Sequence, residues 1–185
     1  MFAYCLNNPI IFGDFTGEDA VILLDNDAPT HIGIMAQDAN GNWWHFYWGV
    51  DPNYIGWCVF GFNLPVYTWC KKYTGSITVE AINKSKQFND YESMLRLYGD
   101  FSFSAEAMRK AVGEYNLYTN NCSQVSLRIL AASDTFYSSI LQKASDMIVP
   151  NDAFKYLTIS PAVIIIGIVS QITSLAVESI KNCAA

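Results

Sequence analysis

The sequence predicts an α+β fold, in which a mainly stranded first half precedes a mainly helical second half. Residues 18–84 contain short apolar runs separated by turn residues, whereas from about Asp90 apolar residues recur at helical spacing. Hydrophobic residues make up 51% of the 185 residues and charged residues only 15%, so the chain can build a packed core. We expect one domain over 18–150, followed by an apolar helical segment over 151–185.

Alternating and continuous apolar runs predict the strands. The continuous apolar run that begins at Ala20 fits a buried strand. The Asn40-Gly41 pair, which separates the two runs that follow, is typical of a hairpin turn. Strands are expected at Ala20–Leu24, His31–Gln37, Trp43–Trp48 and Ser76–Ile82.

Apolar spacing of three and four residues predicts helices in the second half. Asn120-Asn121 supplies a start signal for the helix that follows it. Helices are expected over Tyr91–Tyr98, from Ser104, from Cys122 to about Ala132 and over Thr135–Met147.

An uncharged segment spans residues 156–177 and is long enough to cross a bilayer. Polar residues interrupt it, and an apolar stripe runs along one side at helical spacing. The stripe favours a helix packed on the domain or in a partner's groove, with a membrane segment as the alternative. Its members are Ile165, Ile168, Val169, Ile172, Leu175 and Ala176.

Charge and cysteine content exclude several classes of protein. Eleven basic residues against seventeen acidic ones give a net charge of −6, and no basic cluster is present, which argues against nucleic-acid binding. Five scattered cysteines and two histidines indicate neither a disulfide scaffold nor a zinc site, and no nucleotide-binding motif occurs, so no cofactor or metal is expected. The first residues lack the pattern of a signal peptide.

Cys122 is the strongest candidate for chemistry. It opens a predicted helix, where backbone amides and the helix dipole favour negative charge, lower a thiol pKa and could hold an oxyanion. A thiol nucleophile needs an imidazole base and a group that orients the imidazole. His31 begins a predicted strand, and His45 lies on the next one. The alternatives are a buried structural cysteine and histidines bonded locally or within the core.

Other candidates are weaker. Asn121 precedes the thiol and Trp43 belongs to an aromatic strand, so both are candidates for contacts with substrate or oxyanion. Aromatic strands more often belong to the core. The acidic residues Asp25 and Asp27 are explained by the turn that contains them.

A histidine strand His31-Ile32-Gly33-Ile34, a second strand with a central histidine, and Asn121-Cys122 opening a later helix resemble the circularly permuted papain-like superfamily. That group includes lecithin:retinol acyltransferase-like proteins and permuted relatives of NlpC-type endopeptidases. The resemblance covers roughly residues 19–132. It implies an antiparallel sheet packed on the nucleophile helix, extra C-terminal helices, and a triad of Cys122, His31 and His45. The two histidines are fourteen residues apart instead of the usual twelve, which leaves His45 in doubt.

The run Phe2-Ala3-Tyr4-Cys5-Leu6-Asn7-Asn8-Pro9 is similar to the end of the Rhs repeat-associated core. Asp14-Phe15-Thr16-Gly17 departs from the usual turn by carrying Phe15 in place of proline. The resemblance implies that residues 1–17 end such a core and that the rest is a bacterial toxic tip, delivered as part of a larger Rhs protein. An immunity protein would then be a partner.

The expected function is therefore that of a cysteine peptidase, amidase or acyltransferase acting on a protein, a peptidoglycan peptide or a lipid ester. Two alternatives stay open. One is an inactive papain-like module that only binds, and the other is a toxin tip that inserts into a membrane through residues 156–177.

Overall fold

A computed structural model describes residues 19–27, 30–50, 66–85, 90–110, 113–134 and 136–183. It confirms the α+β class. The Rhs-like run at 1–17 lies outside the described residues.

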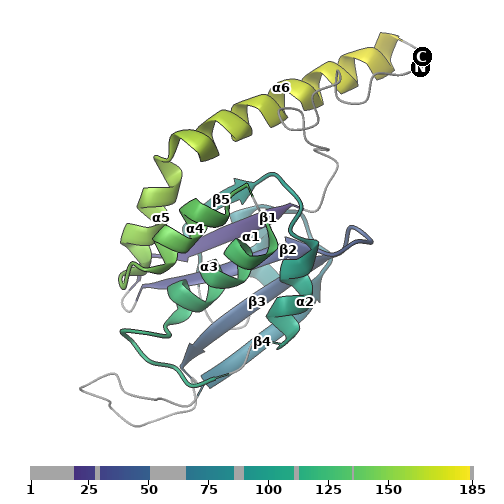
Figure 1. Ribbon diagram of the computed structural model, residues 1–185. Helices are drawn as coiled ribbons and strands as arrows, with labels where there is room; N and C mark the ends of the chain where they lie inside the picture. The colour runs from purple at the N-terminus through teal and green to yellow at the C-terminus, as the bar shows by residue number, and fades with distance from the viewer. Residues whose placement is uncertain are drawn as a thin grey trace.

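One antiparallel sheet forms the centre of the molecule, with its strands in the order β4-β3-β2-β1-β5 (Figure 1). Three of the predicted strands are present almost as expected. The strands are β1 (Ala20–Asp25), β2 (His31–Gln37), β3 (Trp43–Val50), β4 (Val66–Tyr73) and β5 (Ser93–Leu97).

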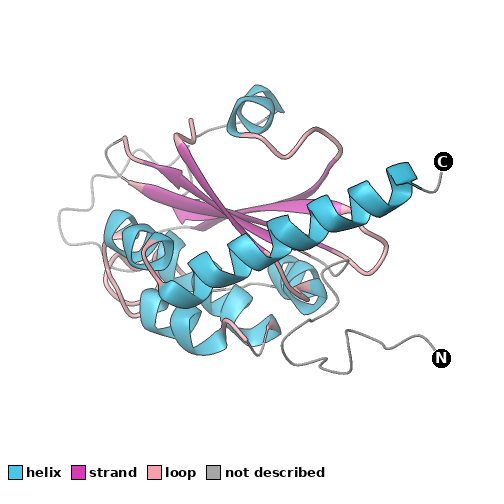
Figure 2. Ribbon diagram, turned by 90° about the horizontal axis from the view of Figure 1, so that it is seen from above, coloured by secondary structure: helices cyan, strands magenta, loops and turns pink. Residues whose placement is uncertain are grey.

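Helices cover both faces of the sheet, so strand residues of either parity are buried (Figure 2). The larger core lies on the face that carries Ile22, Ile34 and Phe46, where α2 to α5 pack. The smaller core lies on the opposite face, beneath Ile82 of α1. The helices are α1 (Val79–Ser85), α2 (Ser102–Lys110), α3 (Cys122–Ser133), α4 (Ser138–Ser145), α5 (Pro150–Thr158) and α6 (Pro161–Cys183).

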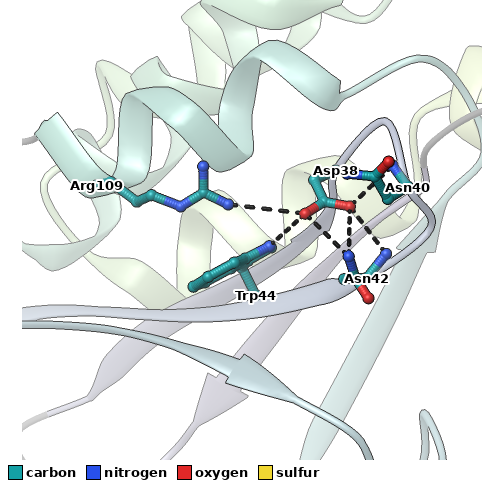
Figure 3. Close-up of polar contacts among 5 residues, drawn as sticks. All are labelled: Asp38, Asn40, Asn42, Trp44 and Arg109. Atoms are coloured by element: carbon teal, nitrogen blue, oxygen red, sulfur yellow. Dashed lines mark hydrogen bonds and ion pairs between the residues drawn. The ribbon is translucent and has the colours of Figure 1, made fainter.

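The β2–β3 hairpin is held by the carboxylate of Asp38, as Figure 3 shows. It accepts hydrogen bonds from the amides of Asn40 and Asn42, both at 3.0 Å, and from the indole of Trp44 at 2.9 Å. Gly41 closes the turn at a φ of +74°, a conformation that glycine adopts readily. The Asn-Gly signal therefore predicted the hairpin correctly, and Asp38 supplies the bonds that fix its shape.

Two predicted elements are wrong. The strand expected at Ser76–Ile82 is instead a turn at residues 76–78 followed by the first turn of α1, which Thr78 caps by accepting from the amide of Ala81 at 3.2 Å. The helix expected at Tyr91–Tyr98 is instead β5, which pairs with the free edge of β1. Both faces of β5 contact apolar neighbours. A short strand of that kind lacks the alternation of apolar and polar residues by which a strand is recognised in a sequence.

The apolar C-terminal segment forms two helices rather than one. α5 belongs to the core, where Ala153 and Leu157 are fully buried. The chain then turns at 159–160, and α6 extends away along one side of the domain (Figure 1). The stripe expected to pack is instead exposed, by 59% at Ile165 and 67% at Leu175, so packing of this stripe on the described domain was a wrong prediction. The turn gives α6 a different inward side, which includes Val163 and Ser170.

In the described part of the chain no single helix is long and apolar enough to cross a membrane. α5 and the first half of α6, bent by 56° where they meet, pass that test only as a pair and only by length and composition.

Candidate active site

The sheet opens between β2 and β3 at one end. Within these two strands, the pairing covers four positions and ends at Ile34 opposite Phe46. Beyond that point β3 continues to pair with β4 as far as Val50, while β2 pairs with β1 from His31 onward. The first residues of β2 and the last residues of β3 thus diverge.

The backbone of β2 points a hydrogen-bond donor into this opening. The amide of Gln37 bonds the carbonyl of Asp19 on the β1 side at 3.0 Å. Successive backbone groups of a strand point to opposite sides, so the amide of Ile32 faces the β3 side, where the pairing has ended. This amide is among the groups that lower the pKa of the Cys122 thiol. The cysteine therefore occupies the place where the sheet would otherwise continue.

Cys122 is the first residue of α3, and Asn121 fixes that position. The Asn121 side chain accepts from the backbone amide of Gln124 at 3.0 Å, and the Gln124 side chain accepts from the backbone amide of Asn121 at 3.1 Å. The side-chain amide of Asn121 also donates to the backbone carbonyls of Leu117 at 2.9 Å and Ile148 at 2.8 Å. Both of its hydrogens are thus committed, so Asn121 is a positioning residue and offers no donor to an oxyanion.

The thiol of Cys122 lies among hydrogen-bond donors. Besides the amide of Ile32, its own amide, the amide of Ser123 and the hydroxyl of Tyr115 act on it as donors that lower its pKa. The two helix amides and the Tyr115 hydroxyl form the kind of donor cluster that stabilises a thiolate or an oxyanion.

His31 lies directly beside this cluster, since it precedes Ile32 in β2. Its ring stacks on Tyr47, with 4.6 Å between the ring centroids, and Tyr47 interacts electrostatically with Cys122. The Nε2 atom of His31 is buried and has no hydrogen-bond partner. A buried polar atom without a partner is costly, and this one belongs to the ring that stacks on Tyr47.

His45 lies further along the same face of the sheet. Its register partner is Met35, four residues beyond His31. Its Nε2 atom and the hydroxyl of Tyr91 are 3.1 Å apart, and its ring packs edge-on against Trp69. The structure thus links Cys122 and His31 through Tyr47, which stacks on His31 and interacts electrostatically with Cys122, whereas His45 lies level with Met35, four residues further along the sheet.

Trp43 lies at the hairpin end of β3, opposite Gln37 and far along the strand from the opening. Its ring contacts the guanidinium of Arg96, which lies 5.7 Å from the ring centroid. It therefore does not line the site at Cys122.

Asp25 lies beside His31, although sequence reasoning set it aside as part of a turn. It is buried and is the register partner of His31 on the neighbouring strand, which places the two Cβ atoms about 5 Å apart. The amide of Asp27 donates to one of its oxygens at 2.9 Å. The sequence did contain a signal. Strand alternation places Asp25 on the same face of β1 as Val21 and Leu23, so a carboxylate on that buried face could have been recognised.

Tyr47 and Tyr115 were missed as well. Tyr47 follows His45 by two residues, so strand alternation alone places both on one face. Tyr115 lies in the loop before α3 and carries no comparable signal.

Burial has the largest effect on the pKa values of Cys122 and His31. Burial raises the pKa of Cys122 to about 11, although the amides of Ile32, Ser123 and Cys122 and the hydroxyl of Tyr115 act in the opposite direction. Burial, with a smaller contribution from His45, lowers the pKa of His31 to about 3. The lowered thiol pKa expected from the helix start is therefore wrong for the free protein, in which thiol and imidazole are both neutral.

No group of three or more metal-ligating side chains occurs within the described ranges. Comparisons with protein-family models, with curated proteins and with solved structures found no match for this chain.

Proposed function

We propose that the protein is a cysteine-dependent hydrolase or acyl-transfer enzyme of the permuted papain-like type, with Cys122 as nucleophile and His31 as base. One observation carries the proposal: the thiol of Cys122 lies at the capped start of α3, where the amide of Ile32, the residue that follows His31, is among the groups that lower its pKa. A nucleophile, a base and a cluster of donors are the components that acyl transfer requires.

In the proposed reaction, Nε2 of His31 takes the thiol proton while the sulfur bonds to the carbonyl carbon of an amide or ester. Because burial disfavours either charge alone, thiolate and imidazolium form together, each stabilising the other. The donors around the sulfur, led by the amides of Ser123 and Cys122, stabilise the oxyanion. The leaving amine or alcohol takes the proton from His31 as the thioester forms.

Water then attacks the thioester and gives a proton to His31, which returns it to the departing sulfur. The products are a carboxylic acid and the free thiol. Asp25, across the strand pair from His31, is better placed to orient the imidazole than His45, whose Nε2 contacts Tyr91.

We further propose that this activity is the toxic tip of an Rhs-type protein, with an immunity protein as partner and a protein, a peptidoglycan peptide or a lipid ester as target. The support is the Rhs-like run at residues 2–9 and the resemblance of the Cys122 and His31 segments.

A chromogenic acetyl ester tests the chemistry. The wild type should acquire one acetyl group on the peptide that contains Cys122, detected by mass spectrometry after acid quenching. Cys122→Ala should abolish the label and His31→Gln should reduce it at least a hundredfold. Cys70→Ser is the matched control, because the thiol of Cys70 is also free and lies on β4. Labelling that persists in Cys122→Ala would reject the proposal.

A second candidate is membrane contact through α6. The observation that favours it is the run of exposed apolar side chains on that helix, including Ile168 at 52% and Ile172 at 62%. Leakage of anionic vesicles that survives Cys122→Ala and disappears on truncation after Ser160 would favour this candidate over the hydrolase.

A further inference from the structure

The hydroxyl of Tyr91 lies between the two histidines. Tyr91 stands between α1 and β5 and is buried. A Cβ atom added to Gly33 would overlap the Tyr91 hydroxyl, so this hydroxyl lies directly against Gly33 of β2. Gly33 is two residues, or about 7 Å, from His31 along β2, and equally far from Met35, the register partner of His45. Strand alternation places these three positions of β2 on one face of the sheet.

On one side the Tyr91 hydroxyl contacts His45. Its oxygen lies 3.1 Å from Nε2 of His45, and the two rings pack edge-on with 5.7 Å between their centroids. Burial raises the pKa of Tyr91, so the hydroxyl keeps its proton. A protonated phenol both donates and accepts hydrogen bonds. The hydroxyl can therefore bond His45 and act on a second group at the same time.

On the other side Tyr91 faces the candidate active site. Its hydroxyl interacts electrostatically with Tyr47, Asp25 and Cys122. Tyr47 stacks on His31, and Asp25 is the register partner of His31 on β1. The groups on which Tyr91 acts are thus the proposed nucleophile and the two neighbours of the proposed base.

The backbone of Tyr91 is held from two directions. Its amide donates to Oδ1 of Asn83 in α1 at 3.0 Å, and Nδ2 of Asn83 donates to its carbonyl at 2.8 Å. The amide of the next residue, Glu92, donates to the carbonyl of Leu24 in β1 at 2.8 Å. These three bonds fix the chain at Tyr91 and leave its hydroxyl little freedom to move from Gly33. Such support is what a residue needs if it is to position others.

We propose that Tyr91 is a positioning residue that links His45 to the candidate active site, so that His45 acts on His31 and Cys122 through the Tyr91 hydroxyl. The link between the histidines stands on the contacts described above, whereas its role in turnover rests on the proposed hydrolase activity. The alternative is that His45 acts on His31 by itself, and the Tyr91 hydroxyl would then be dispensable.

Nuclear magnetic resonance tests the link without any substrate. The chain contains only two histidines, so protein labelled with ¹⁵N-histidine gives ring signals from His31 and His45 alone, and His45→Gln assigns them. Tyr91→Phe should shift the ring signals of both histidines. The matched control is Tyr137→Phe, because Tyr137 is also buried and its hydroxyl donates to the carbonyl of Tyr98 at 3.2 Å, within the larger core. It should leave the His31 signals in place. Unchanged His31 signals in Tyr91→Phe would overturn the link.

Acetylation of Cys122 by the chromogenic ester tests the role in turnover. Tyr91→Phe should lower the rate constant of acetylation about tenfold or more, the effect of one lost hydrogen bond near a developing charge, with little change in KM. His45→Ala should cause a similar loss, and the double variant should lose no more than either single variant, because the two residues act as one unit.

A conservative variant separates the two roles of His45. His45→Gln keeps an amide that can bond the Tyr91 hydroxyl, so it should recover much of the rate lost in His45→Ala. This comparison leaves Tyr91 unchanged, so it decides the question even if Tyr91→Phe fails to fold. Equal losses in His45→Gln and His45→Ala would mean that the imidazole acts by itself, which would overturn the proposal.

The outcomes separate this proposal from the hydrolase proposal. Acetylation of Cys122 at the wild-type rate in Tyr91→Phe, with folding verified by urea unfolding, would reject the positioning role and leave the hydrolase intact. Multiplied losses in the double variant would also reject it. Absence of acetylation in the wild type would reject the hydrolase and the role in turnover together, and the His31 signals would still decide whether Tyr91 links the histidines.

Discussion

The thiol of Cys122 in the free protein should react slowly with iodoacetamide at neutral pH. Its pKa is raised to about 11 by burial, so at pH 8 roughly one molecule in a thousand carries a thiolate. An ordinary thiol with a pKa near 8.5 is about one quarter ionised at that pH. Ionisation alone therefore predicts alkylation more than a hundredfold slower than that of N-acetylcysteine amide.

The assay is the rate of carbamidomethylation of the Cys122 peptide between pH 6.5 and 10.5, followed by mass spectrometry. The rate should keep rising through pH 10 without a plateau. His31→Gln should leave this profile unchanged, because His31, with a pKa of about 3, is neutral and contributes no charge to the resting thiol.

A plateau below pH 8 that His31→Gln abolishes would refute this reasoning. It would mean that thiolate and imidazolium already form an ion pair in the free protein. The two outcomes distinguish an enzyme that ionises its nucleophile when substrate binds from one that holds it ionised at rest.

Three further variants test the framework of the site. Gly33→Ala should destabilise the protein by about 1–3 kcal/mol in urea unfolding, because the added methyl group would overlap the ring of Tyr91; an unchanged midpoint would contradict this packing. Asn121→Ala should cost about 1–3 kcal/mol, since one cap and two bonds to carbonyls disappear, and a serine in its place should restore part of the loss. Hydrogen bonds from Trp44 and the hairpin backbone, opposed by desolvation, lower the pKa of Asp38 to about 2. Its stabilisation is complete above its usual value of 3.8 and is lost as the pH falls toward 2, so acid melts of Asp38→Asn should show less loss of stability over that window than the wild type.

Sequence patterns predicted the elements that carry the candidate site. The helix at Cys122 was recognisable because its cap is local, lying within four residues of the chain. The β2–β3 hairpin was recognisable because the turn itself contains Asn40 and Gly41. In each case the information needed is contained in a short segment.

The relation between the elements could not be predicted in the same way. β5 became a strand because the edge of β1 was available to it, and its own spacing also fitted a helix. Burial of Cys122 overrode the effect of the helix start on the thiol pKa, because desolvation depends on the whole surroundings of the sulfur. The donor from Ile32 depends on where the pairing of two strands ends, which no local pattern reports.

The opening between β2 and β3 separates the strands that carry the candidate site from the edge strand β4. β1, β2 and the start of α3 hold Asp25, His31 and Cys122, whereas β4 forms one edge of the sheet and α1 follows it in the chain. Exchanges on β4 or α1 leave the pairing of β1 with β2 and the cap of α3 intact. Substitutions at the edge of the sheet can therefore change its surface without moving the proposed nucleophile and base.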